Sequence, residues 1–219
     1  CGSALAFASG RCKANHEIVG SAVKKRGSAL QFAARKCQSD VDLVLAAVKK
    51  DGGALQYAAN SCKCDRKIVR AALRRDAFNL QYAASVCQSD RKLVLTAVKS
   101  NAHALGLAAA NCRSDPEIVL AAVQQVPYAL GYASGSCRSD RAIVLAAIQH
   151  SNCLATTRTT WEYAADTCKG DYDIVLAAVK KFGDALQYSA DRCRGDRAIV
   201  LAAVQSNGNA LMHAAHACK

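Results

Sequence analysis

Cysteine is the residue type in this chain with the most potential for chemistry, and its spacing is regular. Six cysteines recur every 25 residues, and three more resume that spacing after one longer step. These nine form the cysteine ladder: Cys12, Cys37, Cys62, Cys87, Cys112, Cys137, Cys168, Cys193 and Cys218. Regularly spaced cysteines can form disulfides, bind a metal ion or supply a nucleophile. Each of these three chemistries needs side chains that lie close together. The helices or strands that carry the ladder therefore determine which of them is possible.

Disulfides between ladder members are disfavoured by distance. The Cα atoms of a disulfide lie ~4.4–6.8 Å apart, whereas equivalent positions in stacked helical repeats should lie nearer ~10 Å apart. We therefore interpret the ladder as small buried apolar residues in positions that Leu would also fit. Cys1, Cys64 and Cys153 lie off the ladder, and the spacing assigns them no partner. An array this apolar needs no disulfides, which favours a reducing intracellular compartment.

Metal binding has weak support in the spacing. Cys62 and Cys64 are a single pair of ligands, and no second pair follows at zinc-site spacing. His213, His216 and Cys218 could converge on the last helix, although two of them occupy ordinary repeat positions. We therefore expect no metal ion and no other cofactor.

Catalysis would need a nucleophile, a base and an orienting group that converge. Almost every polar residue of this chain is explained by its position in the repeat. His16, His103 and His150 are left over, without evident partners. The sequence therefore predicts a protein that is not an enzyme, with no catalytic residues.

Basic residues follow the same period and give the chain a net charge of +12. The post-cysteine row consists of Lys13, Lys63, Arg113, Arg138, Lys169, Arg194 and Lys219, with Gln38 and Gln88 as exceptions. The helix-end row closes the first helix of the repeats and consists of Lys24, Lys25, Lys49, Lys50, Arg74, Arg75, Lys99, Lys180 and Lys181. Periodicity places the two rows on opposite edges of the array.

Two interpretations of these rows stay open. They can be a solvated rim that complements helix dipoles, or an extended cationic track for an acidic protein or for RNA or DNA. The candidate partner-binding residues are Lys49, Lys50, Lys63, Arg74, Arg75, Arg113, Arg138, Arg158, Lys169, Lys180, Lys181 and Arg194.

An aromatic ladder recurs at one repeat position: Phe7, Phe32, Tyr57, Tyr82, Tyr132, Tyr163 and Tyr188. Such rings could stack on bases. A repeat protein that reads one base per repeat varies two or three side chains per repeat, whereas the Gln before the aromatic residue repeats largely unchanged. An aromatic residue at a fixed helical position is usually packing, so nucleic acid is the second choice of partner.

The segment from Asp40 to Lys50 shows how each repeat begins. Asp40 can accept hydrogen bonds from the first turn of a helix, and Lys50 suits the negative end of its dipole. Asp65, Asp90, Asp115, Asp140, Asp171 and Asp196 share this position, and Asn15 fills it in the first repeat. These signals predict a first helix of roughly 11 residues. Leu45 should be less enclosed than its neighbours, because Gly20 and Arg70 replace it in other repeats.

A second helix is predicted from about Gly53 to Cys62. Leu55, Ala58, Ala59 and Cys62 have the spacing of one helical face. The preceding Asp-Gly-Gly sequence would be the hinge between the two helices. Neither short helix would be stable alone, so neighbouring repeats must supply the stability.

The repeats divide the chain as follows. A half repeat covers residues 1–14, and repeats start near residues 15, 40, 65, 90, 115, 140, 171 and 196. Six extra residues fall near 150–160, where a surface loop is expected, either a tolerated bulge or a loop specific to a partner. Trp161 then takes the Leu55 position and should be a core anchor. The chain begins within a repeat and lacks a polar capping repeat at either end, so we expect it to be part of a longer protein.

The repeat motif, D-x-x-[IVL]-V-L-A-A-V followed by A-L-x-[FY]-A, resembles an uncharacterised family of tandem repeats, a domain of unknown function. In that family the ladder position is usually Leu, so Cys62 departs from the pattern. The resemblance implies a helical array and no catalytic residues.

Together these patterns predict an all-α, right-handed α-solenoid of about eight helix-turn-helix repeats. No apolar run approaches the ~20 residues that a membrane-spanning helix needs. We expect a scaffold or adaptor that binds one or more proteins with acidic surfaces, plausibly within a large assembly; a sequence-tolerant RNA- or DNA-binding solenoid is the alternative.

Overall fold

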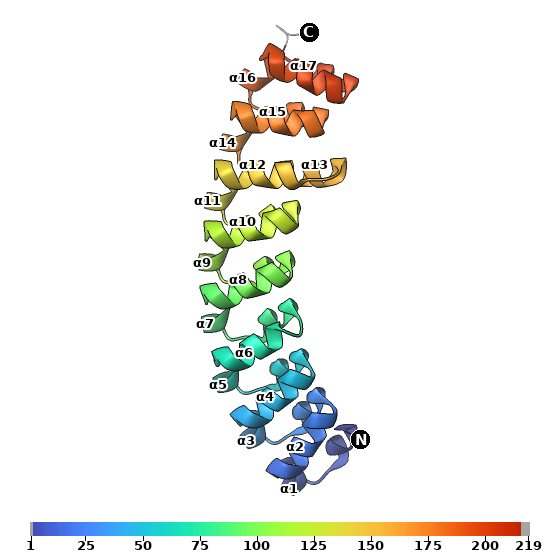
Figure 1. Ribbon diagram of the computed structural model, residues 1–219, viewed down its shortest axis with the longest axis vertical. Coiled ribbons are helices and arrows are strands. Elements are labelled where there is room, and N and C mark those ends of the chain that lie inside the picture. The colour runs from blue at the N-terminus through green and yellow to red at the C-terminus, as the bar shows by residue number, and fades with distance from the viewer. Residues whose placement is uncertain (1, 216–219) are drawn as a thin grey trace. The chain divides into compact units, whose positions relative to one another are not determined.

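The computed structural model describes residues 2–215 of the chain, and that part is helical without a β-strand. The chain divides into two compact units, the N-terminal unit (Cys1–Cys112) and the C-terminal unit (Arg113–Lys219). Within each unit the same set of helical segments recurs (Figure 1). The predicted all-α tandem repeat is therefore confirmed.

The first helix of each repeat is an α-helix of eight or ten residues. These helices are α2 (His16–Lys25), α4 (Val41–Lys50), α6 (Arg66–Leu73), α8 (Arg91–Ser100), α10 (Pro116–Gln125), α12 (Arg141–His150), α15 (Tyr172–Lys181) and α17 (Arg197–Ser206). The predicted caps are confirmed: the Asp40 carboxylate accepts from the backbone N–H of Leu43 at 2.9 Å, and Pro116 stands in the first turn of α10. Leu45 is half-buried, as predicted, whereas Val44 is fully buried.

The second half of each repeat differs from the prediction of one continuous helix. It begins with a 3-10 helix and ends with a short α-helix of four residues, separated by two extended residues. The 3-10 helices are η1 (Gly2–Phe7), η2 (Gly27–Phe32), η3 (Gly52–Tyr57), η4 (Ala77–Tyr82), η5 (Ala102–Leu107), η6 (Pro127–Tyr132), η7 (Gly183–Tyr188) and η8 (Gly208–His213). The short helices are α1 (Gly10–Lys13), α3 (Arg35–Gln38), α5 (Asn60–Lys63), α7 (Ser85–Gln88), α9 (Ala110–Arg113), α11 (Gly135–Arg138), α14 (Asp166–Lys169) and α16 (Asp191–Arg194).

The break has a physical cause in the neighbouring repeat. Ala58 and Ala59 are extended, and the backbone N–H of Ala59 donates to the carbonyl of Gln38 at 2.9 Å. The same bond recurs from Ala34 to Lys13, Ala84 to Lys63, Ala109 to Gln88, Ser134 to Arg113, Ala165 to Arg138, Ala190 to Lys169 and Ala215 to Arg194. A continuous helix would use this N–H internally. The break therefore exchanges a local hydrogen bond for one that joins successive repeats.

Helices of the same kind pack against each other within each unit. In the N-terminal unit α2, α4, α6 and α8 contact in sequence, and the 3-10 helices η1 to η5 do likewise (Figure 1). In the C-terminal unit α10, α12, α15 and α17 contact in sequence. The core lies between these layers, where Val48, Leu55 and most of their repeat equivalents are buried, whereas in the last repeat Val204 is half-buried and Leu211 is exposed. Repeats therefore supply each other's apolar cover, as the short helices require.

The extra residues near 150–160 form a helix, so the prediction of a surface loop is wrong. Helix α13 (Leu154–Tyr163) replaces the 3-10 helix of this repeat. Trp161 is fully buried, as predicted, and its indole N–H donates to the carbonyl of Ala185 at 3.2 Å. The extra residues thus lengthen a packed element, because the first turns of α13 extend the segment that carries the Trp anchor.

Candidate binding surface

The helix-end row of the N-terminal unit is a cluster of seven exposed basic side chains. They stand at the C-terminal ends of α2, α4, α6 and α8: Lys24, Lys25, Lys49, Lys50, Arg74, Arg75 and Lys99. These four helices lie side by side and run in the same sense, so their ends form one edge of the unit. Cations suit the negative end of each helix dipole.

These basic side chains are not neutralised by neighbouring acids. In the part of the chain that the structure describes, none of the seven is in an ion pair. The nearest acids along the chain are Asp51 and Asp76, and each carboxylate accepts a backbone N–H of the following 3-10 helix, from Gly53 and Phe78 respectively. The row therefore presents an excess of positive charge to solvent, because seven cations stand beside two carboxylates.

The C-terminal unit has a different surface at the same repeat positions. Its equivalents are Gln124, Gln125, Gln149, His150, Lys180, Lys181, Gln205 and Ser206. Lys181 donates to the backbone carbonyls of Gln149 and Ser151 at 2.7 and 2.6 Å. The N-terminal unit has 18 Lys and Arg against 7 Asp and Glu, a net charge of +11, and the C-terminal unit has 11 against 10, a net charge of +1. The charge of the chain thus belongs almost wholly to one unit.

A groove opens beside the helix-end row between η3 and η4. It has a volume of about 410 Å³, and its lining includes Lys50, Arg75, Phe78, Gln81 and Tyr82. The Phe78 ring is 40% exposed, whereas Tyr82 is half-buried. Two cations and an accessible ring therefore face one opening.

The post-cysteine row is less available than the sequence suggests. Its residues carry the carbonyls that accept the inter-repeat hydrogen bonds. In the C-terminal unit, Lys169 pairs with Asp166 at 3.7 Å and Arg194 pairs with Asp191. The exceptions Gln38 and Gln88 each donate to the carbonyl of a Leu in the 3-10 helix of their own repeat, at 3.2 Å. The side chains of this row therefore also serve local structure.

The other predicted site residues, Arg113, Arg138 and Arg158, differ in their surroundings. Arg158 pairs with Glu162 on α13, with its Nε 3.0 Å from a carboxylate oxygen. Arg138 is half-buried, and its Nε is buried without a hydrogen-bond partner among the described residues. Arg113 is exposed, whereas Lys219 of the post-cysteine row lies outside the described residues. Arg113, Arg138 and Arg158 belong to the C-terminal unit, whereas the seven exposed cations belong to the N-terminal unit.

Ion pairs between repeats are a feature that the sequence prediction missed. Where the residue after the capping position is basic, it can reach the capping Asp of the next repeat: His16 reaches Asp40 at 3.5 Å. Arg66 pairs likewise with Asp90, and Arg141 with Asp171, in the latter case at 3.1 Å. His16 therefore has a partner, contrary to the prediction. His150 contacts the carbonyl of Ala146 at 2.9 Å, and His103 also has an interaction partner.

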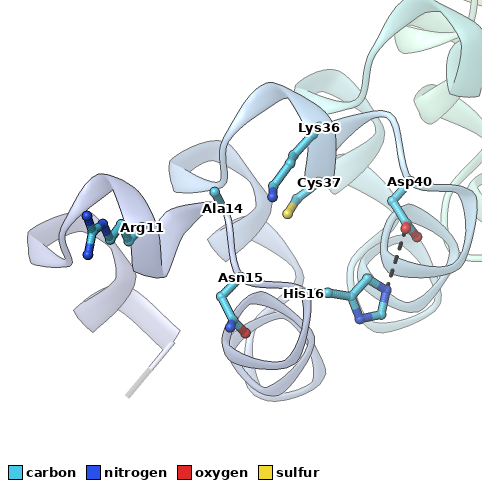
Figure 2. Close-up of a pocket in the computed structure, with 7 residues that line it drawn as sticks. All are labelled: Arg11, Ala14, Asn15, His16, Lys36, Cys37 and Asp40. Atoms are coloured by element: carbon cyan, nitrogen blue, oxygen red, sulfur yellow. Dashed lines mark ion pairs between the residues drawn. The ribbon is translucent and has the colours of Figure 1, made fainter.

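One groove brings cysteine, histidine and aspartate together. Figure 2 shows it at the N-terminal ends of α2 and α4, with Arg11, His16, Cys37 and Asp40 among its lining residues and a volume of about 530 Å³. A nucleophilic cysteine needs a lowered pKa. Here burial raises the pKa of Cys37, with Lys36 lowering it and Asp40 raising it to smaller extents. The arrangement keeps this thiol protonated and does not supply a nucleophile.

Seven ladder cysteines, from Cys37 to Cys193, are buried as predicted, and several of them also make a hydrogen bond that Leu could not make. Their thiols donate to a backbone carbonyl of the preceding repeat, at 3.2–3.5 Å: Cys62 to Ser39, Cys87 to Cys64, Cys112 to Ser89, Cys168 to Ser139 and Cys193 to Gly170. Periodicity gave no signal for these bonds. Cys12 is half-buried, Cys64 and Cys153 are exposed, and the ten described cysteines are all free thiols. Cys1 lies outside the described residues.

Among residues 2–215, no three His, Cys, Asp or Glu side chains are placed to hold a metal ion. The predicted candidates His216 and Cys218 lie outside the described residues. Nor does any helix in the described part of the chain have the length and apolar character needed to cross a membrane.

The recurring helical unit and its caps define an all-α tandem-repeat protein. The chain belongs to the family described as a domain of unknown function (DUF4116), which matches residues 40–85, 90–136, 115–156 and 161–216. The resemblance indicated by the repeat motif is thus confirmed. Neither a curated protein nor a solved structure matches the chain.

Proposed function

We propose that this chain is a non-enzymatic scaffold or adaptor that binds an acidic partner protein along the helix-end row of its N-terminal unit. In this proposal the repeats wind as a right-handed α-solenoid, and the protein is an accessory subunit of a larger assembly. The observation that carries the proposal is the cluster of seven exposed, unpaired cations on one edge of one unit. Uncompensated charge of one sign attracts partners of the opposite sign.

The dimensions of the row favour an extended partner segment. Neighbouring packed helices lie roughly 10 Å apart, so four helix ends span about 30 Å. An extended peptide of about nine residues covers this distance. Single exposed ion pairs contribute only ~0–1 kcal/mol each, so binding must come from several contacts at once. Such binding is weakened by salt, because exposed charges are screened.

RNA or DNA is the second candidate partner, and the groove beside the row is the observation that favours it. Lys50 and Arg75 could contact phosphates while the exposed face of Phe78 stacks on a base. The aromatic ladder itself supports this reading less, because Tyr57 and Tyr82 are half-buried in the repeat.

The test compares two labelled probes on the full chain, by fluorescence anisotropy at ~50 mM and ~200 mM salt. One probe is a peptide of about ten residues, mostly Glu and Asp, and the other is a single-stranded RNA of equal charge. The row variant is Lys49→Gln, Lys50→Gln, Arg74→Gln and Arg75→Gln. Its matched control removes four charges from the opposite edge of the same unit: Arg11→Gln, Arg35→Gln, Lys36→Gln and Lys63→Gln.

We expect the row variant to weaken peptide binding at least about tenfold, which is ~1.4 kcal/mol, and the control to weaken it less than about threefold. Equal losses in both variants would show attraction by net charge alone and contradict the proposed surface. RNA that binds more tightly than the peptide and is weakened further by Phe78→Ala would establish the second candidate instead.

A further inference from the structure

Cys64 is the one place where a thiol occupies the residue that follows a short helix. This position holds Ala14, Ser39, Ser89, Ser114, Ser139, Gly170 and Gly195 in the other repeats. Cys64 ends α5 and is exposed. The equivalent carbonyl in other repeats accepts the thiol of the next ladder cysteine. Here, therefore, a ladder thiol is directed at a residue that has a thiol of its own.

The ladder cysteine directed at this residue is Cys87. Its Sγ lies 3.2 Å from the carbonyl oxygen of Cys64, the shortest of the thiol–carbonyl contacts given above. Cys87 is 1% exposed, whereas the neighbouring ladder cysteine, Cys62, points its thiol to Ser39 in the preceding repeat. Cys64 is exposed, so its side chain is free to change rotamer toward Cys87. The Cys87 thiol thus contacts the backbone of Cys64 where two adjoining repeats join.

We propose that Cys64 and Cys87 form a reversible intramolecular disulfide when the protein meets hydrogen peroxide. The Cys64 thiolate attacks one peroxide oxygen, the O–O bond breaks, and the released hydroxide takes a proton to leave as water. The resulting sulfenic acid is attacked by the Cys87 sulfur; an S–S bond forms, the S–O bond breaks, and the Cys87 proton leaves with that oxygen as a second water. Two thiols are oxidised by two electrons, and the peroxide is reduced to two waters.

The environments of the two thiols assign their order of reaction. Cys64 is open to solvent and meets the oxidant first. Burial raises the pKa of Cys87, and the negative charge of ionised Cys64 raises it further, as do Asp90 and Asp65, whereas Arg66 lowers it. Cys87 is therefore the protected, resolving thiol, which reacts only with a sulfenic acid formed beside it.

The disulfide would close a loop around α6 and η4. A cross-link of this kind restricts the unfolded chain and raises stability. Helix α6 and the turn after it carry Arg66, Lys67, Arg70, Arg74 and Arg75. Oxidation would thus fix the repeat at the centre of the N-terminal unit's basic surface, whether or not that surface binds an acidic protein.

The test uses the full chain, an equimolar amount of hydrogen peroxide, and blocking of residual thiols with N-ethylmaleimide. Trypsin cleaves after Lys63, so Cys62 and Cys64 fall on separate peptides. We expect a non-reducing digest of monomeric protein to contain peptide 64–66 linked to peptide 76–91, and dithiothreitol to release both. The oxidised protein should melt several degrees above the reduced protein.

Two variants make the result specific. Cys64→Ser places at this position the residue that four other repeats have, so it should fold normally and lose both the cross-link and the melting shift. Cys153→Ser removes another exposed thiol and should keep both. A cross-link that contains peptide 51–63, a disulfide between two molecules, or Cys64 oxidised with Cys87 still free would each overturn the proposal.

Discussion

The two units share a repeat but differ in surface charge. The N-terminal unit ends its first helices in Lys and Arg, whereas the C-terminal unit ends three of its four in Gln, His or Ser. Yet α10 and α12 have the same length as α4, a capping Asp like it, and buried residues at the same four positions. Cations at the helix ends are therefore not required for the repeat to fold. That independence supports a binding role for the helix-end row.

In the C-terminal unit several basic side chains contact acidic side chains or backbone carbonyls of the same unit. Arg141 contacts both Asp171 and Asp173, Arg158 contacts Glu162, and Lys181 closes on two backbone carbonyls. Exposed pairs like these contribute little individually. Basic residues of the C-terminal unit therefore contact its own acids and carbonyls, whereas the helix-end cations of the N-terminal unit face solvent; Arg66, which pairs with Asp90, lies at the start of its helix.

The largest effect should come from the anchor that distinguishes the C-terminal unit. Trp161→Ala removes a fully buried ring, so we expect a loss of about 3–5 kcal/mol in the free energy of unfolding. Trp161→Leu restores the residue of the regular repeat. It should still cost about 1–2 kcal/mol, because α13 has reshaped the site and the carbonyl of Ala185 loses one of its two side-chain donors, keeping the Ser189 hydroxyl. Urea unfolding followed by circular dichroism measures both changes. An unchanged free energy of unfolding for Trp161→Leu would contradict the prediction, because it would show that this position accepts Leu as other repeats do.

In both units a glycine lies close to the backbone of the next repeat, and replacing it should reduce stability to a similar extent. A Cβ on Gly27 would lie 2.4 Å from the carbonyl oxygen of Ala47, and one on Gly183 would lie 2.6 Å from that of Ala203. Gly27→Ala and Gly183→Ala should each cost roughly 1–3 kcal/mol, because backbone must move. Gly10→Ala is the control, since nothing lies within 4 Å of its added Cβ. It should be neutral or stabilise by up to ~1 kcal/mol; equal losses in all three variants would contradict the packing argument.

These cases separate what the sequence could predict from what it could not. The first helices carry their signals locally, in a capping Asp or Asn and an apolar run, and were predicted closely. The break at Ala58 and Ala59 was not, because Ala favours helices and the bond that stabilises the break comes from Gln38 in another repeat. The helix-end row could also be predicted, because its Lys and Arg residues recur at the same repeat position. An ion pair such as Arg141 with Asp171 depends on how repeats stack.

A smaller effect is expected from pH at the ion pair between repeats. Burial raises the pKa of Asp171, but hydrogen bonds from the Ile174 N–H and from Arg141 outweigh burial, so the net shift is downward. A lowered folded pKa means that the carboxylate stabilises the fold above its ordinary pKa of about 3.9, and that this stability is lost as pH falls through the folded value. The contribution should be about 1 kcal/mol, as for other capping residues.

Arg141→Gln tests this contribution in the C-terminal unit. Without the guanidinium, the pKa of Asp171 should rise toward its ordinary value, and the acid loss of stability should begin at higher pH. A carbon-detected NMR titration of the Asp171 carboxyl between pH 2 and 6 measures the midpoint. An unchanged midpoint would mean that the pair between the repeats does not influence this carboxylate. Arg158→Gln, which removes a pair confined to α13, is the control and should leave the midpoint in place.

The smallest effect concerns Cys153, an exposed thiol at the start of the inserted helix α13. Hydrogen bonds from Thr156, through its hydroxyl and its backbone N–H, lower the pKa of Cys153. Thr156→Val removes the hydroxyl, so the pKa should rise and the thiolate fraction near pH 7 should fall. The intrinsic nucleophilicity of a thiolate rises with its pKa, with a Brønsted slope of ~0.4–0.5. About half of the loss is therefore compensated, and the reaction with an aromatic disulfide should slow only about two- to threefold. Cys64 serves as the internal reference, because it lies in the other unit and keeps its rate; a parallel slowing of both thiols would point to altered folding and against the hydrogen bond.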